Sequence, residues 1–273
     1  MTTDAKTLFS EGGLAAAIEA QMALVRQRAT DADARAFLTD LLCFAGDFER
    51  ADKQLDVIAS QRTDLAVPVA LSRQLVRAAV ARRDVFEKGR PPELLAGADG
   101  TIQASLRVLL DVRQGAAAAA AAAAAELEAS HPRLRGTCDG AAFDDVRDAD
   151  DVTARVLEVL TSTGKYYWVP LSSIGLLEFR KPERARDLLW RRAHIEVRGG
   201  PDGEVYVPAI YPLAPDAGAA NADALRLGRE TDWRGRDGEP ARGIGQRVFL
   251  VGDEGRPINE IGTLAFAAPA AAG

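Results

Sequence analysis

Cysteine and histidine are scarce in this chain, which has two of each among its 273 residues. The two cysteines, Cys43 and Cys138, are too few for a framework of disulfides or for a structural zinc site. Cys43 lies in an apolar run with helical spacing, where a free thiol behaves as a small hydrophobic side chain. This usage is typical of a protein of the reducing cytoplasm.

Long apolar runs and an excess of positive charge are also lacking. No stretch approaches the roughly 20 apolar residues that span a bilayer. Residues 1–13 contain acids but not the apolar segment of a secretory signal. The formal net charge of −6 predicts no basic face for nucleic acid. With 47% hydrophobic and 27% charged residues, we expect a cytoplasmic globular protein that inserts into no membrane.

Aromatic residues are distributed unevenly along the chain. All three tryptophans and all four tyrosines follow residue 160, whereas the first half is rich in alanine, leucine, arginine and aspartate. Such a step in composition predicts two domains of different architecture, joined near residues 131–140. We expect a helical domain over residues 1–135 and an α+β domain over residues 136–273.

A short motif occurs twice in the helical half, as GGLAAA at residues 12–17 and as GDFERA at residues 46–51. The offset is 46 − 12 = 34 residues, and this period resembles the tetratricopeptide repeat, a unit of two antiparallel helices. Gly46 can adopt the left-handed backbone that ends a helix, and Asp47 can cap the next helix through its carboxylate. The motif therefore predicts a corner between two helices.

The repeat fades further along the chain. Residues 89–100 break the helical pattern, although an apolar side chain returns at Leu106, two periods after Leu38. Ten alanines at residues 116–125 predict a further helix, because alanine has the highest helix propensity; a low-complexity linker is the alternative. We expect a tetratricopeptide-like solenoid of about three to four helix pairs.

The second half contains short segments with strand character. Residues 152–164 are expected to form an amphipathic helix ended by Gly164, and residues 182–190 a short one. The strand candidates are residues 165–171, 174–179, 193–197, 204–211, 246–253 and 262–267. Residues 198–203 read RGGPDG and predict a hairpin loop. We expect an α+β domain with a mostly antiparallel sheet that could curl into a barrel-like form.

Five aspartates gather before the first expected helix of this half, and a divalent metal is one interpretation of them. They are Asp144, Asp145, Asp148, Asp150 and Asp151. The run lacks the glycine and the glutamate that an EF-hand loop needs at its sixth and twelfth positions. Acids also favour the positive end of a helix, so helix capping and surface positions are the preferred interpretation.

Signals for catalysis are weak. Residues 243–248, GIGQRV, have two glycines of a dinucleotide loop but lack the third and precede a strand, which indicates a turn or bulge. His194 beside Glu196 could act as a base, although alternate polar positions on a strand usually mark a solvent face. Trp190 and Trp233 stand next to arginines, which suits either carboxylate binding or packing at the edge of a core.

A larger pattern is visible in the second half. The motifs AFDDVRDADD, YYWVPL, RARDLLWRRAHIEV, GPDGEVYVPAIYP and GIGQRVFLVGDE occur in this order. Together with LTDLLCFAGDFERADKQLD nearer the N-terminus, they resemble the ImpE family, also called TagJ, of accessory proteins of bacterial type VI secretion systems. The resemblance extends from Leu8 to Glu254, and the stretch from RDLLWRRA to VPAIYP is its most specific part. The ten alanines and the loop at residues 214–222 depart from the family pattern.

The resemblance implies a protein without enzymatic activity, and it implies no cofactor, no catalytic residue and no metal ligand. Members of the family are cytoplasmic, with a tetratricopeptide-like N-terminal part and an α+β C-terminal part. They are associated with the contractile sheath and bind an N-terminal helix of the small sheath subunit, TssB. They are thought to influence sheath assembly or its recycling by the ClpV unfoldase. We therefore expect an adaptor with these partners.

A solenoid of helical repeats has a concave groove, into which an amphipathic helix can lay its apolar face. If Leu38 occupies the seventh position of a repeat, six residues would face this groove. They are Ala36, Asp40, Cys43 and Phe44 on one helix, and Gln74 and Arg77 one repeat later. Our hypothesis is that Phe44 anchors the guest helix while Asp40 and Arg77 set its orientation. The alternative is that these are ordinary solvent or core positions and that the C-terminal domain binds the partner.

The competing hypothesis is an enzyme or ligand-binding protein whose α+β domain uses a small molecule or nucleotide. Its candidate residues are Asp144, Asp148, Arg191 and His194. No nucleophile–base pair and no set of metal ligands stands at a recognisable spacing, so the adaptor is the preferred function.

Overall fold

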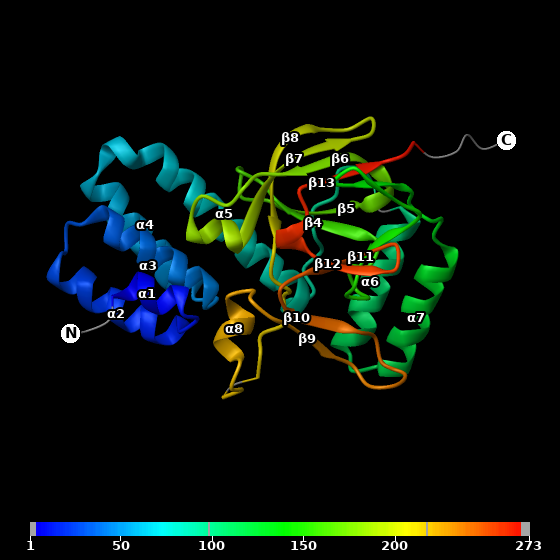
Figure 1. Cartoon of the computed structure of the whole chain (residues 1–273), viewed down its shortest axis with the longest axis horizontal. Coiled ribbons are helices and arrows are strands. Elements are labelled where there is room, and N and C mark those ends of the chain that lie inside the picture. The colour runs from blue at the N-terminus through cyan, green and yellow to red at the C-terminus, as the bar shows by residue number, and fades with distance from the viewer. Residues whose placement is uncertain (1–3, 98, 217, 269–273) are drawn as a thin grey trace.

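The computed structural model describes residues 4–97, 99–216 and 218–268. Helices occupy one end of the molecule and strands the other, with two further helices along the strand-rich end (Figure 1). The helices are α1 (Ala5–Ser10), α2 (Leu14–Gln27), α3 (Ala32–Phe44), α4 (Phe48–Gln61), α5 (Ala66–Lys88), α6 (Gly100–Arg113), α7 (Ala117–Ser130) and α8 (Ala222–Arg226). Short 3₁₀ segments are η1 (Thr63–Leu65), η2 (Leu171–Ser173), η3 (Ala185–Leu188) and η4 (Ile258–Glu260).

The helix corner predicted at Gly46 is confirmed. Gly46 adopts a left-handed backbone with φ of 74° between α3 and α4. The Asp47 carboxylate accepts a hydrogen bond from the backbone N–H of Arg50 at 3.2 Å, which caps α4. Gly12 and Gly115 adopt the same left-handed backbone shortly before α2 and α7. Glycine therefore marks the corner before each of these three helices.

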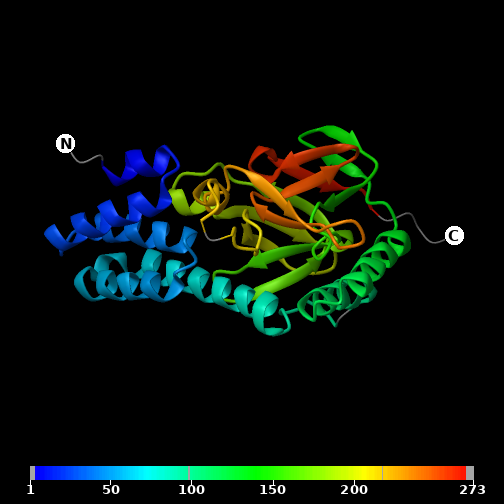
Figure 2. The same cartoon turned by 90° about the horizontal axis from the view of Figure 1, so that it is seen from below.

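The helices do not continue as a regular repeat. Successive helices from α1 to α5 pack against one another, but α5 has 23 residues and is followed by an extended segment. This segment reaches the strands, where Glu93 forms a parallel bridge with Tyr167. Helices α6 and α7 form a separate pair beside the strand-rich end (Figure 2). The continuous tetratricopeptide-like solenoid is therefore not confirmed.

The alanine run forms most of α7, as its helix propensity predicts. Ala120 has no exposed surface, and Ala123 and Ala124 are partly buried against the hydrophobic core. Helix α7 packs against α6. The prediction of a helix is confirmed, and the linker alternative is wrong.

The main sheet contains eight strands in the order β2-β1-β13-β6-β7-β8-β4-β5. They are β1 (Gly136–Cys138), β2 (Ala141–Phe143), β4 (Val156–Leu160), β5 (Tyr166–Pro170), β6 (Ile174–Phe179), β7 (Trp190–Val197), β8 (Asp202–Pro208) and β13 (Thr263–Phe266). Each neighbouring pair in it is antiparallel, as predicted. Among the described strands β2 and β5 form the two edges of this sheet, so it is open, and the expectation of a barrel is wrong.

Two smaller sheets accompany the main one. The first has the order β12-β11-β3 and consists of β3 (Val146–Asp148), β11 (Val248–Val251) and β12 (Glu254–Pro257). The second pairs β9 (Thr231–Arg234) with β10 (Arg242–Gly245). All six predicted strands are present as β5, β6, β7, β8, β11 and β13, and the predicted hairpin loop joins β7 to β8. The short helix predicted over residues 182–190 is only η3, because β7 already begins at Trp190.

The helix predicted over residues 152–164 is wrong. Residues 151–155 form turns, and residues 156–160 form β4, in which every side chain is buried. The side chains of β4 alternate between two hydrophobic cores, one shared with the helices and one within the sheets. A strand buried on both faces lacks the alternation of polar and apolar residues, so its pattern could be mistaken for a buried helix.

One of the two cores crosses the predicted domain boundary. It contains side chains of α2 to α6 together with Trp168, Trp190 and Tyr206 of the main sheet. The other core lies among the sheets, with Phe249 and Leu264 fully buried in it. Helices give way to strands between α7 and β1, close to the expected boundary after residue 135. Because the first core is shared, two separately folding domains stay a prediction.

Candidate functional site

A groove opens between α3, α4 and the start of α5, and we call it the α3–α5 groove. It encloses about 320 Å³ and is bounded on one side by the segment that carries η3. Apolar lining residues are Ala32, Ala36, Leu55, Ile58, Leu65, Pro68 and Val69. Polar lining residues are Asp33, Thr39, Asp40, Ser72, Arg184 and Arg186. The groove therefore combines an apolar wall with charged groups of both signs.

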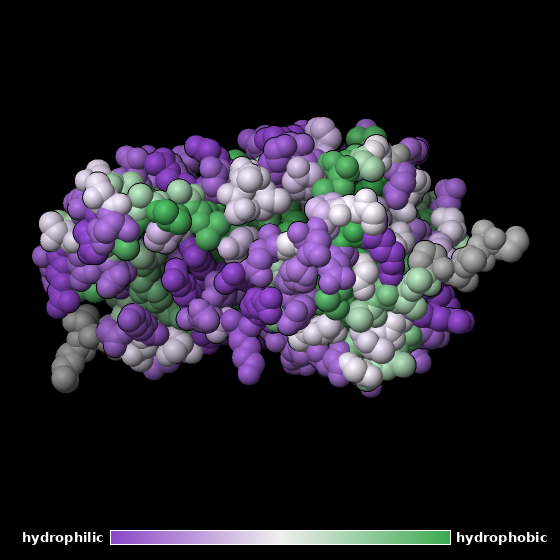
Figure 3. Space-filling model, turned by 90° about the horizontal axis from the view of Figure 1, so that it is seen from above, coloured by the Kyte–Doolittle hydropathy of each residue, from purple (hydrophilic) through white to green (hydrophobic). Residues whose placement is uncertain are grey.

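Two of the six predicted partner-binding residues, Ala36 and Asp40, line the α3–α5 groove. Ala36 is exposed and Asp40 is half-buried. Burial raises the pKa of Asp40 to about 6, against the opposing effect of the Arg186 guanidinium. At the start of α5, Val67 exposes 82% of its surface, and Figure 3 shows hydrophobic patches over the helical half as well as over the strand-rich half. Apolar contact is therefore available around this groove.

The strand-rich half of the chain closes part of the same surface. Arg186 donates a hydrogen bond to the hydroxyl of Ser72 on α5, and Leu188 of η3 packs against the helical core. Cys43 is buried on this side of α3, and burial raises the pKa of its thiol. A partner can therefore use only the open part of the groove, because the chain's own loop covers the rest.

Phe44 lines a different cavity, which we call the junction cavity. It encloses about 310 Å³ between the end of α3, α5 and the segment after β8, and Cys43 also borders it. Phe44 is 5% exposed, and its ring centroid lies 5.6 Å from that of Phe9. Because this ring is already packed, it has little surface left to anchor a guest helix.

Gln74 and Arg77 lie beneath the turn between β4 and β5. A Cβ added to Gly164 in this turn would lie 2.4 Å from Oε1 of Gln74 and 3.5 Å from Cβ of Arg77. Gln74 is half-buried, while Arg77 keeps an exposed side chain. The structure therefore distributes the six predicted residues over the α3–α5 groove, the junction cavity and this turn, and they do not share one surface.

A network of buried charges joins the helices to the main sheet. Arg82 of α5 donates two hydrogen bonds to Glu158 of β4, at 2.7 and 2.9 Å. Arg247 donates to both Glu158 and Asp148, and the hydroxyl of Tyr211 donates to Asp148 at 2.7 Å. Burial opposes the ionisation of Glu158, but the guanidinium groups of Arg82 and Arg247 outweigh it and hold its pKa at about 2. These paired groups form a structural connection.

The interpretation of the aspartate cluster as helix caps and surface positions is wrong for its central members. Asp148 and Asp150 have no exposed surface and pair with Arg247 and Arg242, the latter at 3.0 Å between Nε and Oδ2. A strand follows them instead of a helix, whereas Asp144 at the start of the cluster is exposed. The pairing was missed because both arginines lie more than 90 residues further along the chain.

The glycine motif at residues 243–248 serves packing. A Cβ on Gly243 would lie 2.2 Å from the ring of Tyr211, so this strand position has room only for glycine. Gly245 ends β10 with φ of 82°. Of the two tryptophans beside arginines, Trp190 is buried in the shared core. Trp233 is 43% exposed, and the centroid of its ring lies 5.8 Å from that of the Tyr211 ring.

The four residues of the enzyme hypothesis are not brought together. Asp148 is buried in the charge network, and Asp144 lies on the surface, where it pairs with an arginine at 2.7 Å. Arg191 is buried and donates to the carbonyl oxygen of Ile261 at 3.0 Å. His194 alternates with buried neighbours and lies on the exposed face of β7. No shared reaction centre can be built from these four side chains.

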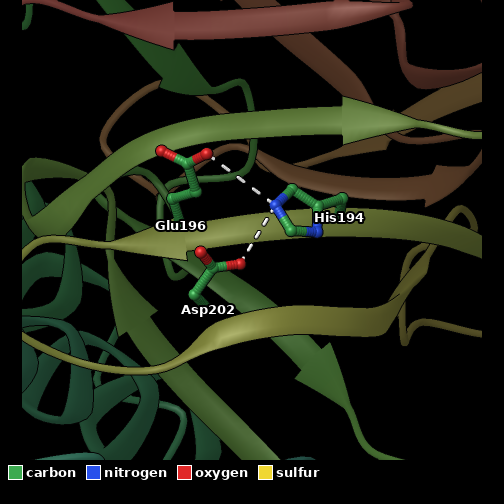
Figure 4. A group of neighbouring side chains, drawn as sticks. All are labelled: His194, Glu196 and Asp202. Atoms are coloured by element: carbon green, nitrogen blue, oxygen red, sulfur yellow. Dashed lines mark ion pairs between the residues drawn. The ribbon is translucent and has the colours of Figure 1, made fainter.

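His194 has acidic neighbours of its own, shown in Figure 4. Its Nε2 lies 3.1 Å from Oδ1 of Asp202 on β8 and 3.8 Å from Oε1 of Glu196 on β7. Among the described residues, these three form the one group of histidine, cysteine and acidic side chains close enough to share a metal ion. The sequence motif placed Glu196 beside His194, but it gave no sign of Asp202. Asp202 comes opposite Glu196 only through the register between β7 and β8.

Comparison with known proteins decides the family. The family model of the ImpE protein matches residues 140–265. The chain is 31% identical over 248 residues to the type VI secretion system accessory component TagJ of Pseudomonas aeruginosa, covering 90% of this chain and 85% of that relative. The chain belongs to the ImpE/TagJ family. The resemblance seen in the sequence motifs is thereby confirmed.

The ImpE/TagJ fold seen here also matches a solved structure. The X-ray crystal structure of protein VPA1032 from Vibrio parahaemolyticus superposes with a TM-score of 0.89 at 30% sequence identity. The match covers 97% of this chain and 98% of the other, so helices and sheets are shared in the same arrangement. In the described part of this ImpE/TagJ chain, none of the helices combines the length and apolar character needed to cross a membrane.

Proposed function

We propose that this protein is a non-enzymatic accessory component of a bacterial type VI secretion system and acts in the cytoplasm as an adaptor. Support comes from the relative named as such a component, which matches 90% of this chain. The scattered positions of Asp144, Asp148, Arg191 and His194 also favour an adaptor over an enzyme.

The proposed partner is the N-terminal helix of the small sheath subunit, TssB, and the proposed docking site is the open part of the α3–α5 groove. One observation carries this site: the groove lies between helices, and its apolar lining includes the exposed side chains of Ala36 and Pro68 and the half-buried side chain of Leu65. An amphipathic helix can lay its apolar side chains, spaced three and four residues apart, into such a groove. Ala36 and Asp40 of the original hypothesis remain in this site, and Phe44 no longer serves as its anchor.

Charge sets the expected orientation of the guest helix. The charges of Arg186 and Arg184 both favour the ionised form of Asp40, and Arg184 is an exposed cation in the lining of the groove. The C-terminal end of a helix carries the negative end of its dipole. The guest helix therefore lies with its C-terminal end toward Arg184.

The test is binding of a fluorescent peptide with the sequence of the TssB N-terminal helix from the same genome, followed by anisotropy with the full chain. Ala36→Arg places a long cation in the groove from an exposed position, and we expect affinity to fall about tenfold or more, about 1.4 kcal/mol. Ala16→Arg is the matched control, because Ala16 is an exposed helical alanine on α2 outside the groove lining. We expect this control to bind as the wild type does.

Two results would contradict the proposal at different levels. Equal binding by wild type and Ala36→Arg would exclude the α3–α5 groove as the docking site. The junction cavity and the sheet would then be the sites to test. If the wild-type chain does not bind the peptide, the N-terminal helix of TssB is excluded as the partner.

The proposed consequence of binding is a change in sheath assembly or in its recycling by ClpV. The measurement is the rate of ClpV-driven disassembly of purified sheath with wild-type protein or with Ala36→Arg. We expect the wild type to change the rate and the variant to leave it close to the rate without adaptor. Identical rates in all three reactions would show that binding has no such consequence.

A further inference from the structure

The hairpin of β7 and β8 presents three potential metal ligands on one face. His194 and Glu196 are two residues apart on β7, so their side chains project to the same side of the strand. Asp202 on β8 lies directly opposite Glu196 in the antiparallel register. Ile195, between the two β7 residues, is buried in the core on the other side of the sheet. The backbone that carries these three side chains is thus fixed by the sheet and by the core beneath it.

Both carboxylates of this group converge on one nitrogen atom. Nε2 of His194 lies 3.1 Å from Asp202 and 3.8 Å from Glu196 (Figure 4). A single imidazole N–H can be donated well to only one of them, so one carboxylate is left without a close partner. In the described part of the chain, the ion pairs of Glu196 and Asp202 all involve His194.

The neighbouring acid on the same face is satisfied in a different way. Glu204 lies opposite His194 in the register, and its carboxylate pairs with Arg192 and, at 3.7 Å, with Arg180. The arginines therefore neutralise the end of the face at Glu204, while the end at Glu196 and Asp202 has two carboxylates for one imidazole. An excess of negative charge with a nitrogen donor at its centre suits a cation.

We propose that His194, Glu196 and Asp202 bind one divalent transition-metal ion, of which Zn²⁺ is the type case. One donor atom from each residue lies within 4.8 Å of the other two. Zinc–nitrogen and zinc–oxygen bonds are about 2.0–2.2 Å long, so ligands of one ion lie at most about 4.4 Å apart. The two distances from Nε2 of His194, 3.1 and 3.8 Å, already meet that limit, and the side chains of Glu196 and Asp202 are exposed and free to rotate.

The donor set also selects the class of ion. An imidazole with two carboxylates suits zinc, nickel or copper, whereas calcium and magnesium prefer sites made of oxygen alone. Three protein ligands leave at least one coordination position of zinc open to water. The half-exposed side chains place that position at the surface of the hairpin, where a donor from another molecule could reach it.

The test is isothermal titration calorimetry, in which zinc chloride is titrated into the full-length, chelator-treated protein. We expect saturable binding of one ion per chain, loss of that binding in His194→Ala, and affinity about tenfold or more weaker in Glu196→Gln. Glu204→Gln is the matched control, because Glu204 is an acid on the same face of the same hairpin that pairs with arginines instead of His194. This control should bind zinc as the wild type does, and calcium chloride should give no saturable heat.

Absence of saturable zinc binding by the wild type would overturn the proposal, as would binding by His194→Ala equal to that of the wild type. Equal weakening by Glu196→Gln and Glu204→Gln would also contradict it, because it would indicate general surface charge. Circular dichroism of each variant checks that the hairpin still folds. The peptide-binding assay for the α3–α5 groove does not depend on this result.

Discussion

Arg82 on α5 and Glu158 on β4 form a two-pronged ion pair across the boundary between helices and main sheet, with hydrogen bonds of 2.7 and 2.9 Å. The Glu158 side chain has no exposed surface, and 13% of the Arg82 side chain is exposed. Arg247 meets Glu158 from the other side. The orientation of α5 on the sheet, and with it one wall of the α3–α5 groove, is therefore tied to a buried charge network.

Removing the charge of Glu158 should destabilise the whole chain. In Glu158→Gln, Arg82 and Arg247 lose their shared counter-charge in a buried site, and we expect a loss of about 3–5 kcal/mol in the free energy of unfolding. Urea unfolding followed by circular dichroism gives this number. Asp144→Asn is the control, because it changes an exposed acid in an exposed ion pair and should leave the midpoint unchanged. Equal midpoints for wild type and Glu158→Gln would contradict the role of the network.

Gly243→Ala should be destabilising, whereas Gly203→Ala should be tolerated. A Cβ at residue 243 would lie 2.2 Å from the Tyr211 ring, and moving that ring strains its hydrogen bond to Asp148. Overpacking of this kind costs about 1–3 kcal/mol. At Gly203 on β8 nothing lies within 4 Å of an added Cβ. Thermal unfolding of the two variants side by side measures the difference, and similar melting temperatures would refute the packing explanation of the glycine motif.

The stability of the chain should depend on pH through Asp40. Burial raises its folded-state pKa from 3.8 to about 6, so between these values the folded chain keeps a proton that the unfolded chain releases. Relative to Asp40→Asn, the wild type should lose about 2 kcal/mol of stability as pH rises from 4 to 6, and the loss should level off above about pH 7. Urea unfolding of both proteins at pH 4 and pH 7.5 tests this sign. A difference that stays constant across this range would mean that Asp40 titrates normally.

Ala120→Leu should destabilise the pair of α6 and α7. Ala120 has no exposed surface, so a larger side chain must push the two helices apart, at a cost of about 1–3 kcal/mol. Ala122→Leu makes the same substitution two residues later at an exposed position and serves as the control. Thermal unfolding by circular dichroism compares them. If both variants melt like the wild type, α7 does not pack on α6 as described.

Local signals in the sequence succeeded where the structure depends on neighbouring residues. The glycine and the aspartate of the GDFERA motif form the predicted corner because backbone conformation and helix capping need only a few adjacent residues. The strand at residues 174–179 was predicted with its bounds for the same reason. The repeat failed after α5 because its continuation depends on which surface the next helix finds, and that surface belongs to the sheet.

The predicted partner-binding site shows the same difference between local signals and contacts with distant residues. Ala36 and Asp40 do line a groove, but Cys43 is buried, and its helix α3 packs against η3, which lies more than 140 positions further along the chain. Phe44 was chosen as an anchor because it is large and apolar, and it is buried for that reason, against Phe9. Helical spacing indicates which side of α3 a residue occupies, but it does not indicate what covers that side.

The sequence by itself determined the family, the change from helices to antiparallel strands, and the corners marked by glycine. These follow from composition, periodicity and short motifs, which act over a few residues. Only the tertiary structure decided that residues 156–160 are a strand buried on both faces, that Asp148 and Asp150 are buried, and that Asp202 joins His194 and Glu196. In each case the partner is distant in the chain, and burial or charge pairing with that partner outweighs the local preference.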